Sequence, residues 1–364
     1  MTEQRQIRYA VVGAGNIAQV AVLPAFSHAG ENSRLVGLIS GDPDKRAALR
    51  ERYGLEVDGD YASFETVLEQ GDIDAVYIAT PNSKHKELAI RAAASGVHVL
   101  CEKPLAPTTL DCREIIDACD ANEVKLMVGY RLHFELANLE AMDIARSGKI
   151  GEVRLFDSFF THVVRPNDAR RDPTLAGGAC YDLGVYCINA ARTIFDAEPT
   201  SVFAHSVQKN GTDDLTLAIL QFPGDRMAQF CVGNSISSVS SYRIGGTDGD
   251  LRVEPAYDYV DELVHYLTIE EKTERRRFPR GDQFAPEIKY FSECILSNRE
   301  PEPSGEEGLC DIRVVEAVLE SARIQRAVSL APYVRRRGPT LAQADHVRPV
   351  KKPEPIEAPS PSLK

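Results

Sequence analysis

The strongest constraint on the fold is the alternation of strand-like and helix-like segments between Ile7 and Gly129. Short apolar runs are followed by longer amphipathic segments, an order typical of parallel βαβ units. Strands are expected at 7–12, 35–40, 75–79, 97–100 and 125–129, and helices at 16–26, 43–53, 64–70, 84–95 and 109–122. This pattern predicts an α/β domain over residues 1–128, built on a doubly wound parallel sheet.

The pattern changes in the second half of the chain. After a helix near 134–147, longer alternating segments predict strands at 152–161, 200–208, 214–222, 226–234 and 241–246. Short turns between them indicate a large, mostly antiparallel sheet in a second α/β domain over 129–330. Further helices are expected at 181–195, 285–297 and 308–325. Residues 331–364 are rich in Pro, Lys and Glu, which predicts an extended or disordered C-terminal tail.

Composition excludes several classes of protein. The 364 residues suffice for two domains, and the net charge of -12 disfavours nucleic acid and anionic membranes as partners. No apolar run has the length of a membrane span, and the start lacks the apolar core of a leader peptide, so a cytoplasmic protein is expected. The eight cysteines show no CxxC or zinc spacing, which predicts reduced thiols and no metal site.

A glycine-rich motif follows the first expected strand. Gly13 would form the tight turn, Gly15 would let the backbone approach a pyrophosphate, and Ala18 would let helix and strand pack closely. Asn16 and Ile17 open the helix whose N-terminus would face the phosphates. The position between a strand and a helix predicts a dinucleotide site, and a glycine turn without ligand is the alternative.

The end of the second strand bears on which dinucleotide binds. An acidic residue here hydrogen-bonds an NAD ribose, whereas this chain has Ser40 and Gly41, with Lys45 a few residues later. A hydroxyl, a backbone N–H and an ammonium suit the 2′-phosphate of NADP. Asp42 complicates the assignment, because it can either face solvent or accept from a ribose. NADP is favoured, NAD is the alternative, and an ordinary surface role for Lys45 stays open.

Two more strand ends should border the cofactor, because doubly wound sheets bind ligands outside the carboxyl ends of their strands. One carries Thr80, Pro81 and Asn82, and the other carries Glu102, Lys103 and a proline. The proline restricts Lys103 to an extended conformation, and we expect the Lys103–Pro104 bond to be cis.

Four motifs together resemble the Gfo/Idh/MocA oxidoreductases: GAGNIA at 13–18, ATPNSKH at 79–85, EKP at 102–104 and GGACYDLGVY at 177–186. The resemblance covers about residues 7–330. It implies a Rossmann domain followed by an α/β domain with a large, mostly antiparallel sheet. It also implies that Lys103 is catalytic and that Glu102 lies near the nicotinamide ribose.

Tyr186 stands where many family members carry histidine. Together with GYRLHF at 129–134 and SGEEGLCDIR at 304–313, it makes the chain most similar to the glucose–fructose oxidoreductase branch. That branch implies oxidation of an aldose at C1, with NADP(H) often held tightly. Asp182 and Tyr186 are four residues apart, so on a helix they share one face.

Chemical roles follow for these residues. Tyr186 would take the proton of the sugar hydroxyl, Lys103 would favour its phenolate form, and Asp182 would orient Lys103 or hold a sugar hydroxyl. His85 and Arg131 are expected at the cofactor, and His162 at the sugar, each with a structural role as the alternative.

The expected partners are a small sugar and a second copy of the chain, because a broad sheet with one free face often forms a homodimer or homotetramer. Two alternatives stay open for the function. One is an aldose or inositol dehydrogenase with freely exchanging NAD(P), and the other is a non-catalytic, cofactor-sensing regulator on the same fold.

Overall fold

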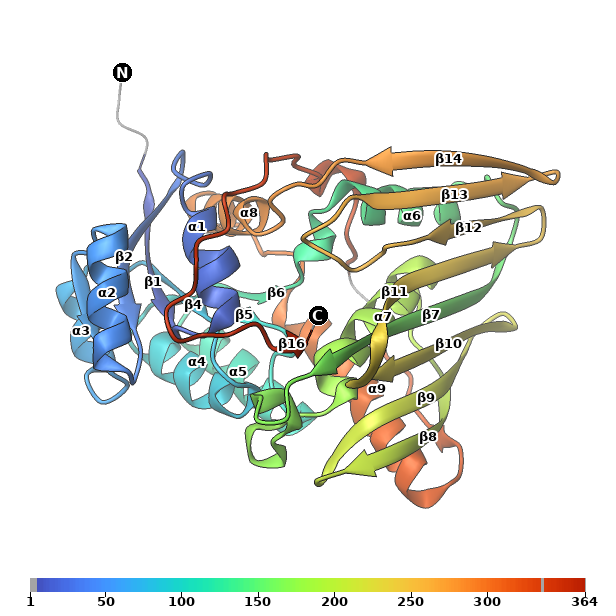
Figure 1. Cartoon of the computed structure of the whole chain (residues 1–364), viewed down its shortest axis with the longest axis horizontal. Coiled ribbons are helices and arrows are strands. Elements are labelled where there is room, and N and C mark those ends of the chain that lie inside the picture. The colour runs from blue at the N-terminus through green and yellow to red at the C-terminus, as the bar shows by residue number, and fades with distance from the viewer. Residues whose placement is uncertain (1–4, 335–336, 364) are drawn as a thin grey trace. The chain divides into compact units, whose positions relative to one another are not determined.

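The computed structural model describes residues 5–334 and 337–363, which form two compact units (Figure 1). Unit 1 contains the described residues up to Arg131, together with Gly281–Leu309 and His346–Pro361. Unit 2 contains Leu132–Arg280, Cys310–Asp345 and the chain from Ser362. Residues 1–4 lie outside the described residues. They belong to the N-terminal stretch that was expected to lack the apolar core of a leader peptide.

This division differs from the predicted boundaries at 128 and 330. A segment expected in the second domain, 281–309, belongs to unit 1, because its helix α8 (Ala285–Leu296) packs on the first sheet. Ser292 of α8 hydrogen-bonds the Tyr9 hydroxyl at 2.8 Å inside the core. This return to the first sheet could not be predicted, because the pattern of a helix does not reveal which sheet the helix covers.

Unit 1 is built on a six-stranded parallel sheet in the order β3-β2-β1-β4-β5-β6, the order of a Rossmann fold. The predicted doubly wound sheet is therefore confirmed. Its strands are β1 (Ile7–Val12), β2 (Ser33–Ile39), β3 (Val57–Gly59), β4 (Ala75–Ile78), β5 (His98–Glu102) and β6 (Leu126–Gly129). The helices are η1 (Ala18–Val22), α1 (Leu23–Ala25), α2 (Pro43–Tyr53), α3 (Phe64–Gln70), η2 (Asn82–Lys84), α4 (His85–Ala94) and α5 (Thr109–Ala121).

The short strand β3 was not predicted. It has only three residues, and two of them, Asp58 and Gly59, are poor strand formers. The longer strands were predictable because helices cover both faces of a parallel sheet, so its strands are apolar throughout. All four residues of β4 and of β6 are buried.

Unit 2 is built on a ten-stranded sheet in which only β7 and β10 pair in parallel. The path runs β14-β13-β12-β11-β7-β10-β9-β8-β15, and β16 also pairs with β7. A mostly antiparallel sheet is thus confirmed. Its strands are β7 (Val153–Val164), β8 (Ser201–Lys209), β9 (Thr212–Phe222), β10 (Arg226–Gly233), β11 (Ser235–Gly246), β12 (Gly249–Val253), β13 (Leu263–Ile269), β14 (Lys272–Phe278), β15 (Val328–Ser329) and β16 (Ser362–Leu363).

Helices α6 (Leu136–Arg146), η6 (Cys180–Gly184) and α7 (Val185–Phe195) of unit 2 share a hydrophobic core with this sheet. The short helical segments η4 (Ala169–Arg171), η5 (Pro173–Leu175) and η7 (Leu341–Gln343) have no buried residues. Helix α9 (Gly305–Ile324) begins in unit 1 and continues into unit 2, and η3 (Arg131–His133) lies at the division. None of the described helices combines the length and apolar character needed to cross a bilayer.

The other face of the sheet carries exposed apolar side chains. Along β9, Thr216, Ala218 and Leu220 are buried, whereas Leu217 and Ile219 between them are about half exposed. Exposed apolar residues on the neighbouring strands are Leu155, Phe159, Phe203, Met227 and Val239. Within the described chain, this sheet face therefore remains open to solvent.

Candidate functional site

The glycine motif forms a cradle at the carboxyl end of β1. Gly13 has φ +102°, and a Cβ there would lie 2.5 Å from the Ala79 carbonyl oxygen, so only glycine fits. A Cβ at Gly15 would meet nothing within 4 Å, which leaves the backbone open to a ligand. The buried Thr80 hydroxyl has no hydrogen-bond partner among the described residues. These features fit a dinucleotide: Gly13, Gly15, Asn16, Ile17 and Ala18 would hold its phosphates.

The C-terminal tail lies against the start of the helix that follows this cradle. The side chain of Gln19 makes two hydrogen bonds with the backbone of Ile356, at 2.7 and 3.0 Å. Asn16 Nδ2 donates to the carbonyl of Ala358 at 2.8 Å. Figure 1 shows this extended segment in dark red, running over unit 1 before it ends at β16. The tail is thus extended, with its backbone bound to the predicted phosphate-binding helix.

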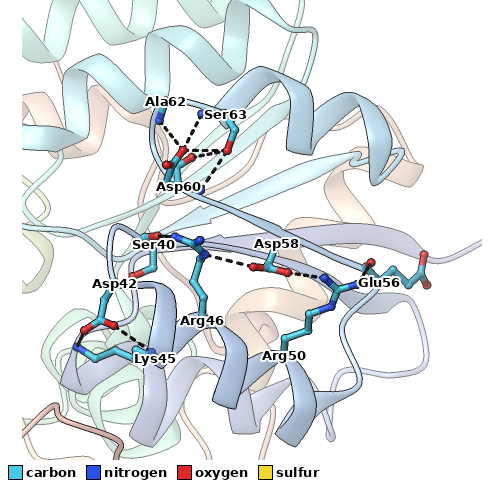
Figure 2. Close-up of polar contacts among 10 residues, drawn as sticks. All are labelled: Ser40, Asp42, Lys45, Arg46, Arg50, Glu56, Asp58, Asp60, Ala62 and Ser63. Atoms are coloured by element: carbon cyan, nitrogen blue, oxygen red, sulfur yellow. Dashed lines mark hydrogen bonds and ion pairs between the residues drawn. The ribbon is translucent and has the colours of Figure 1, made fainter.

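At the end of β2, Arg46 lies beside Ser40, and Lys45 lies beside Asp42 (Figure 2). Asp42 caps helix α2: one carboxylate oxygen accepts from the Lys45 backbone N–H at 3.0 Å, and the other lies 3.4 Å from Lys45 Nζ. The backbone hydrogen bond from Lys45 lowers the pKa of Asp42. Arg46 donates to the Ser40 carbonyl at 2.6 Å and pairs with Asp58 at 3.2 Å.

One carboxylate oxygen of Asp42 therefore caps helix α2. Arg46 was missed by the sequence analysis. The signal was its place directly after Lys45, one helical turn from the strand end. Gly41 lies between Ser40 and Asp42 in the sequence. A Cβ added at Gly41 would lie 3.4 Å from the ring of Tyr61.

The Glu-Lys-Pro segment follows directly on β5, and the Lys103–Pro104 peptide bond is cis, as predicted. His85 is fully buried beside it. Its ring nitrogens lie 2.9 Å from the Pro104 carbonyl and 3.0 Å from the Thr80 carbonyl. Burial lowers the pKa of His85, although the two carbonyls oppose this. His85 thus connects the two strand-end turns that carry Thr80 and Lys103.

A polar cluster lies buried behind Glu102. The Tyr77 hydroxyl lies 2.9 Å from Glu102 Oε1 and 2.8 Å from Glu287 Oε1. Arg131, also buried, donates to the side chain of Gln283. Sequence reasoning missed Tyr77 and Glu287, because one lies within an apolar strand and the other in a helix 210 residues further along.

In unit 2, Asp182 is the centre of a second polar cluster. Arg170 Nε lies 2.9 Å from Asp182 Oδ2, and His162 Nε2 lies 3.4 Å from the same oxygen. Burial opposes the charge of Arg170, but Asp182 and Asp168 raise its pKa, so the guanidinium remains protonated. His162 Nδ1 is 3.1 Å from the Ser362 hydroxyl on β16. The structure thus brings His162 and Arg170 together around Asp182.

Tyr186 lies one turn beyond Asp182, where η6 passes into α7. Its half-buried ring packs edge-on against Phe160 at 5.6 Å and near Tyr257 at 6.0 Å between centroids. His133 is buried and contacts the Asn189 side chain at 2.7 Å. Aromatic packing therefore fixes the position of the Tyr186 ring independently of its hydroxyl.

Comparison with known proteins identifies the family. Residues 7–130 match an oxidoreductase family with an NAD-binding Rossmann fold, GFO_IDH_MocA, and residues 138–252 match the GFO/IDH/MocA C-terminal domain. The chain belongs to the GFO/IDH/MocA oxidoreductase family. The resemblance seen in the sequence motifs is confirmed.

Three relatives within or near this family illustrate its range. D-xylose 1-dehydrogenase [NADP(+)] of Haloarcula marismortui is 32% identical, over 89% of this chain and 93% of its own. The aldose-aldose oxidoreductase of Caulobacter crescentus, solved with glycerol, is 35% identical with a TM-score of 0.85, over 90% of this chain and 100% of its own. A 3-ketoreductase of Actinomadura kijaniata, solved with NADP and TDP-benzene, is 28% identical with a TM-score of 0.81, over 87% and 98%.

Proposed function

We propose that this chain is an NADP(H)-dependent sugar oxidoreductase that oxidises an aldose at C1 to the lactone, with a second sugar re-oxidising a tightly held cofactor. The observation that carries the proposal is the Asp182 cluster one helical turn before Tyr186, a charged group suited to sugar hydroxyls beside a group suited to proton transfer. The similarity to an aldose-aldose oxidoreductase and to a D-xylose dehydrogenase supports the substrate class.

NADP is proposed as the cofactor because of the cations at the end of β2. Ser40, Lys45 and Arg46 offer a hydroxyl, an ammonium and a guanidinium, which suit a 2′-phosphate. The Asp42 carboxylate, which would repel such a phosphate, is bound at the helix N-terminus. Thr80, Pro81, Asn82 and the turn after β5 would complete the nucleotide site.

Oxidation of the sugar at C1 requires the removal of one proton and one hydride. We assign to Tyr186 the removal of the proton from the C1 hydroxyl, and we propose Lys103 as the cation that assists this transfer. Asp182, held by Arg170 and His162, accepts a hydrogen bond from a neighbouring sugar hydroxyl and so orients the ring. The bound cofactor would supply the acceptor for the C1 hydride, and loss of the proton and the hydride would leave the lactone. Reduction of a second sugar reverses both transfers.

Substitution of Tyr186 tests this assignment. Tyr186→Phe removes one oxygen while the ring still packs on Phe160, so the fold and NADP affinity should be retained. Turnover should fall by about 10²–10⁴-fold, the usual contribution of a positioned proton-transfer group. Lys103→Met should have a similar effect, and the double variant should be little worse than either single one. Tyr181→Phe, in the same helical segment, is the matched control. Near-normal kcat for Tyr186→Phe at saturating sugar would refute the proposal.

A dehydrogenase with freely exchanging NAD(P) is the second candidate, which the xylose dehydrogenase relative favours. The two are separated by the absorbance of the purified protein in the reduced-nicotinamide band. Cofactor that survives dialysis and bleaches on addition of a second sugar supports sugar-to-sugar transfer. Intact NADP binding without turnover on a broad sugar panel would instead indicate a cofactor-sensing regulator.

We also propose that the open face of the unit 2 sheet forms a homodimer or homotetramer interface. Leu217 and Ile219 lie on β9 beside Phe203 of β8, which pairs with Ile219. A contiguous apolar face of this kind is typical of an interaction site. Leu217→Arg should shift the mass measured by light scattering toward the monomer, and an unchanged mass would contradict this interface.

A further inference from the structure

Three side chains of unit 1 meet beside the Glu-Lys-Pro turn: the buried Tyr77 of β4, the partly buried Glu102 at the end of β5 and the buried Glu287 of α8. One phenol oxygen lies within hydrogen-bond distance of both carboxyl groups, at 2.9 Å and 2.8 Å. Tyr77 and Glu287 are completely buried. None of the steps assigned above uses Tyr77 or Glu287, so their close arrangement requires its own explanation.

The number of protons constrains this arrangement. A phenol carries one proton and can donate it along only one of these two short contacts, while an ionised carboxylate can only accept. The second contact is therefore a hydrogen bond only if one carboxyl group is itself protonated and donates to the Tyr77 oxygen. Two ionised carboxylates at one buried phenol would also repel each other strongly.

The surroundings indicate which carboxyl group keeps the proton. The positive charges of Lys103 and Arg131 favour the ionised form of Glu102. Glu287 also has Arg131 as a cationic neighbour, but the negative charges of Glu102 and Asp282 disfavour its ionised form. Burial, followed by the charge of Glu102, raises the pKa of Glu287 well above its usual range. Burial also raises the pKa of Glu102, but the charge of Lys103 is the largest influence that lowers it.

The second oxygen of Glu287 supports the same assignment. Glu287 Oε2 is buried and has no hydrogen-bond partner among the described residues. The free energy cost of such an oxygen is modest in a neutral acid, where it is a carbonyl, and large in an anion. The geometry therefore defines a chain of donors that runs from Glu287 through Tyr77 to Glu102.

We propose that Glu287 is a neutral positioning residue that donates its carboxyl proton to Tyr77, so that Tyr77 donates to Glu102 and fixes this carboxylate beside the cofactor ribose. The contact of Glu102 with the cofactor rests on the proposed function. The protonation of Glu287 and the direction of the hydrogen bonds rest on the contacts and charges of unit 1 and do not depend on the proposed function.

Infrared difference spectroscopy tests the protonation without any substrate. The full chain near pH 7 should show the C=O stretching band of a protonated carboxylic acid, shifted in D₂O. This band should disappear in Glu287→Gln and persist in Glu293→Gln, which removes an exposed carboxylate from the same helix. A spectrum without such a band, or a band unchanged in Glu287→Gln, would overturn the proposal.

Binding of NADPH to nucleotide-free protein tests the positioning role. Glu287→Gln keeps an N–H donor toward Tyr77 and should bind NADPH nearly as tightly as the wild type. Glu287→Leu removes the donor and should weaken binding by about tenfold, the scale of one lost hydrogen bond near a charge. Tyr77→Phe, which keeps the ring, should weaken it equally, and provides the test if Glu287→Leu does not fold.

Equal affinities of the Gln and Leu variants would overturn the positioning role. Failure of the proposed function is distinguishable from these outcomes. If Tyr186→Phe retains turnover while the acid band depends on Glu287, the sugar chemistry is wrong and the protonated carboxyl remains.

Discussion

Glu287→Gln should make the free energy of unfolding less sensitive to rising pH. The pKa of Glu287 is raised by burial in the folded state, so the folded protein keeps this proton above the ordinary glutamate range, where the unfolded chain has released it. The contribution of the Glu287 proton to the stability of the fold is thus fully present below the pKa that Glu287 has in the unfolded chain. This contribution is lost as the pH rises toward the pKa that Glu287 has in the folded protein.

The size of the effect follows from one proton. Each pH unit in that interval costs the wild type about 1.4 kcal/mol relative to a variant that cannot titrate. Between pH 5 and 7, Glu287→Gln should therefore gain about 2.7 kcal/mol on the wild type. For a cooperative unit the size of unit 1, this corresponds to roughly 5–10 °C in Tm.

Calorimetry of both proteins at several pH values between 5 and 8, at constant ionic strength, measures this difference. Titrations of groups remote from Glu287 cancel, because both chains keep them in the same surroundings. Glu293→Gln, on the exposed side of α8, should give a Tm curve parallel to the wild type. A Tm difference between wild type and Glu287→Gln that stays constant across this range would show that Glu287 is ionised in the folded state.

Two further predictions concern the nucleotide. Lys45→Ala should raise KM for NADP by about tenfold and leave that for NAD nearly unchanged, because one charge-assisted contact to the 2′-phosphate is lost. The control is Arg50→Ala, which removes another cation of α2, one that pairs with Asp58, and should leave the ratio of the KM values for NADP and NAD unaltered. An equal rise in both KM values in Lys45→Ala would contradict the proposed 2′-phosphate site. Deletion of residues 346–364 removes the backbone bound by Asn16 and Gln19, so cofactor retained through dialysis should decrease; unchanged retention would exclude a role of the tail.

The sequence predicted the fold correctly where a local pattern of residues is compatible with a single structure. Apolar strands covered on both faces revealed the parallel sheet, and the glycine motif marked the ligand-binding edge, because only glycine fits at Gly13. The motif at 177–186 predicted that Asp182 and Tyr186 share a helix face, which the helical segment bears out. The strands β12, β13 and β14 escaped prediction. In β14, the charged exposed residues of Lys272–Phe278 carry little apolar alternation.

What the sequence could not provide was the pairing of distant segments. The two partners of the Tyr77 hydroxyl lie on another strand and on a helix from the far end of the chain, and the backbone of Ile356 in the tail reaches Gln19. In each case a polar group acquires its role by burial against a segment remote in sequence. Glu287 is the clearest example: in an isolated helix it is an ordinary acidic residue, and only beside Tyr77 does its proton become part of the site.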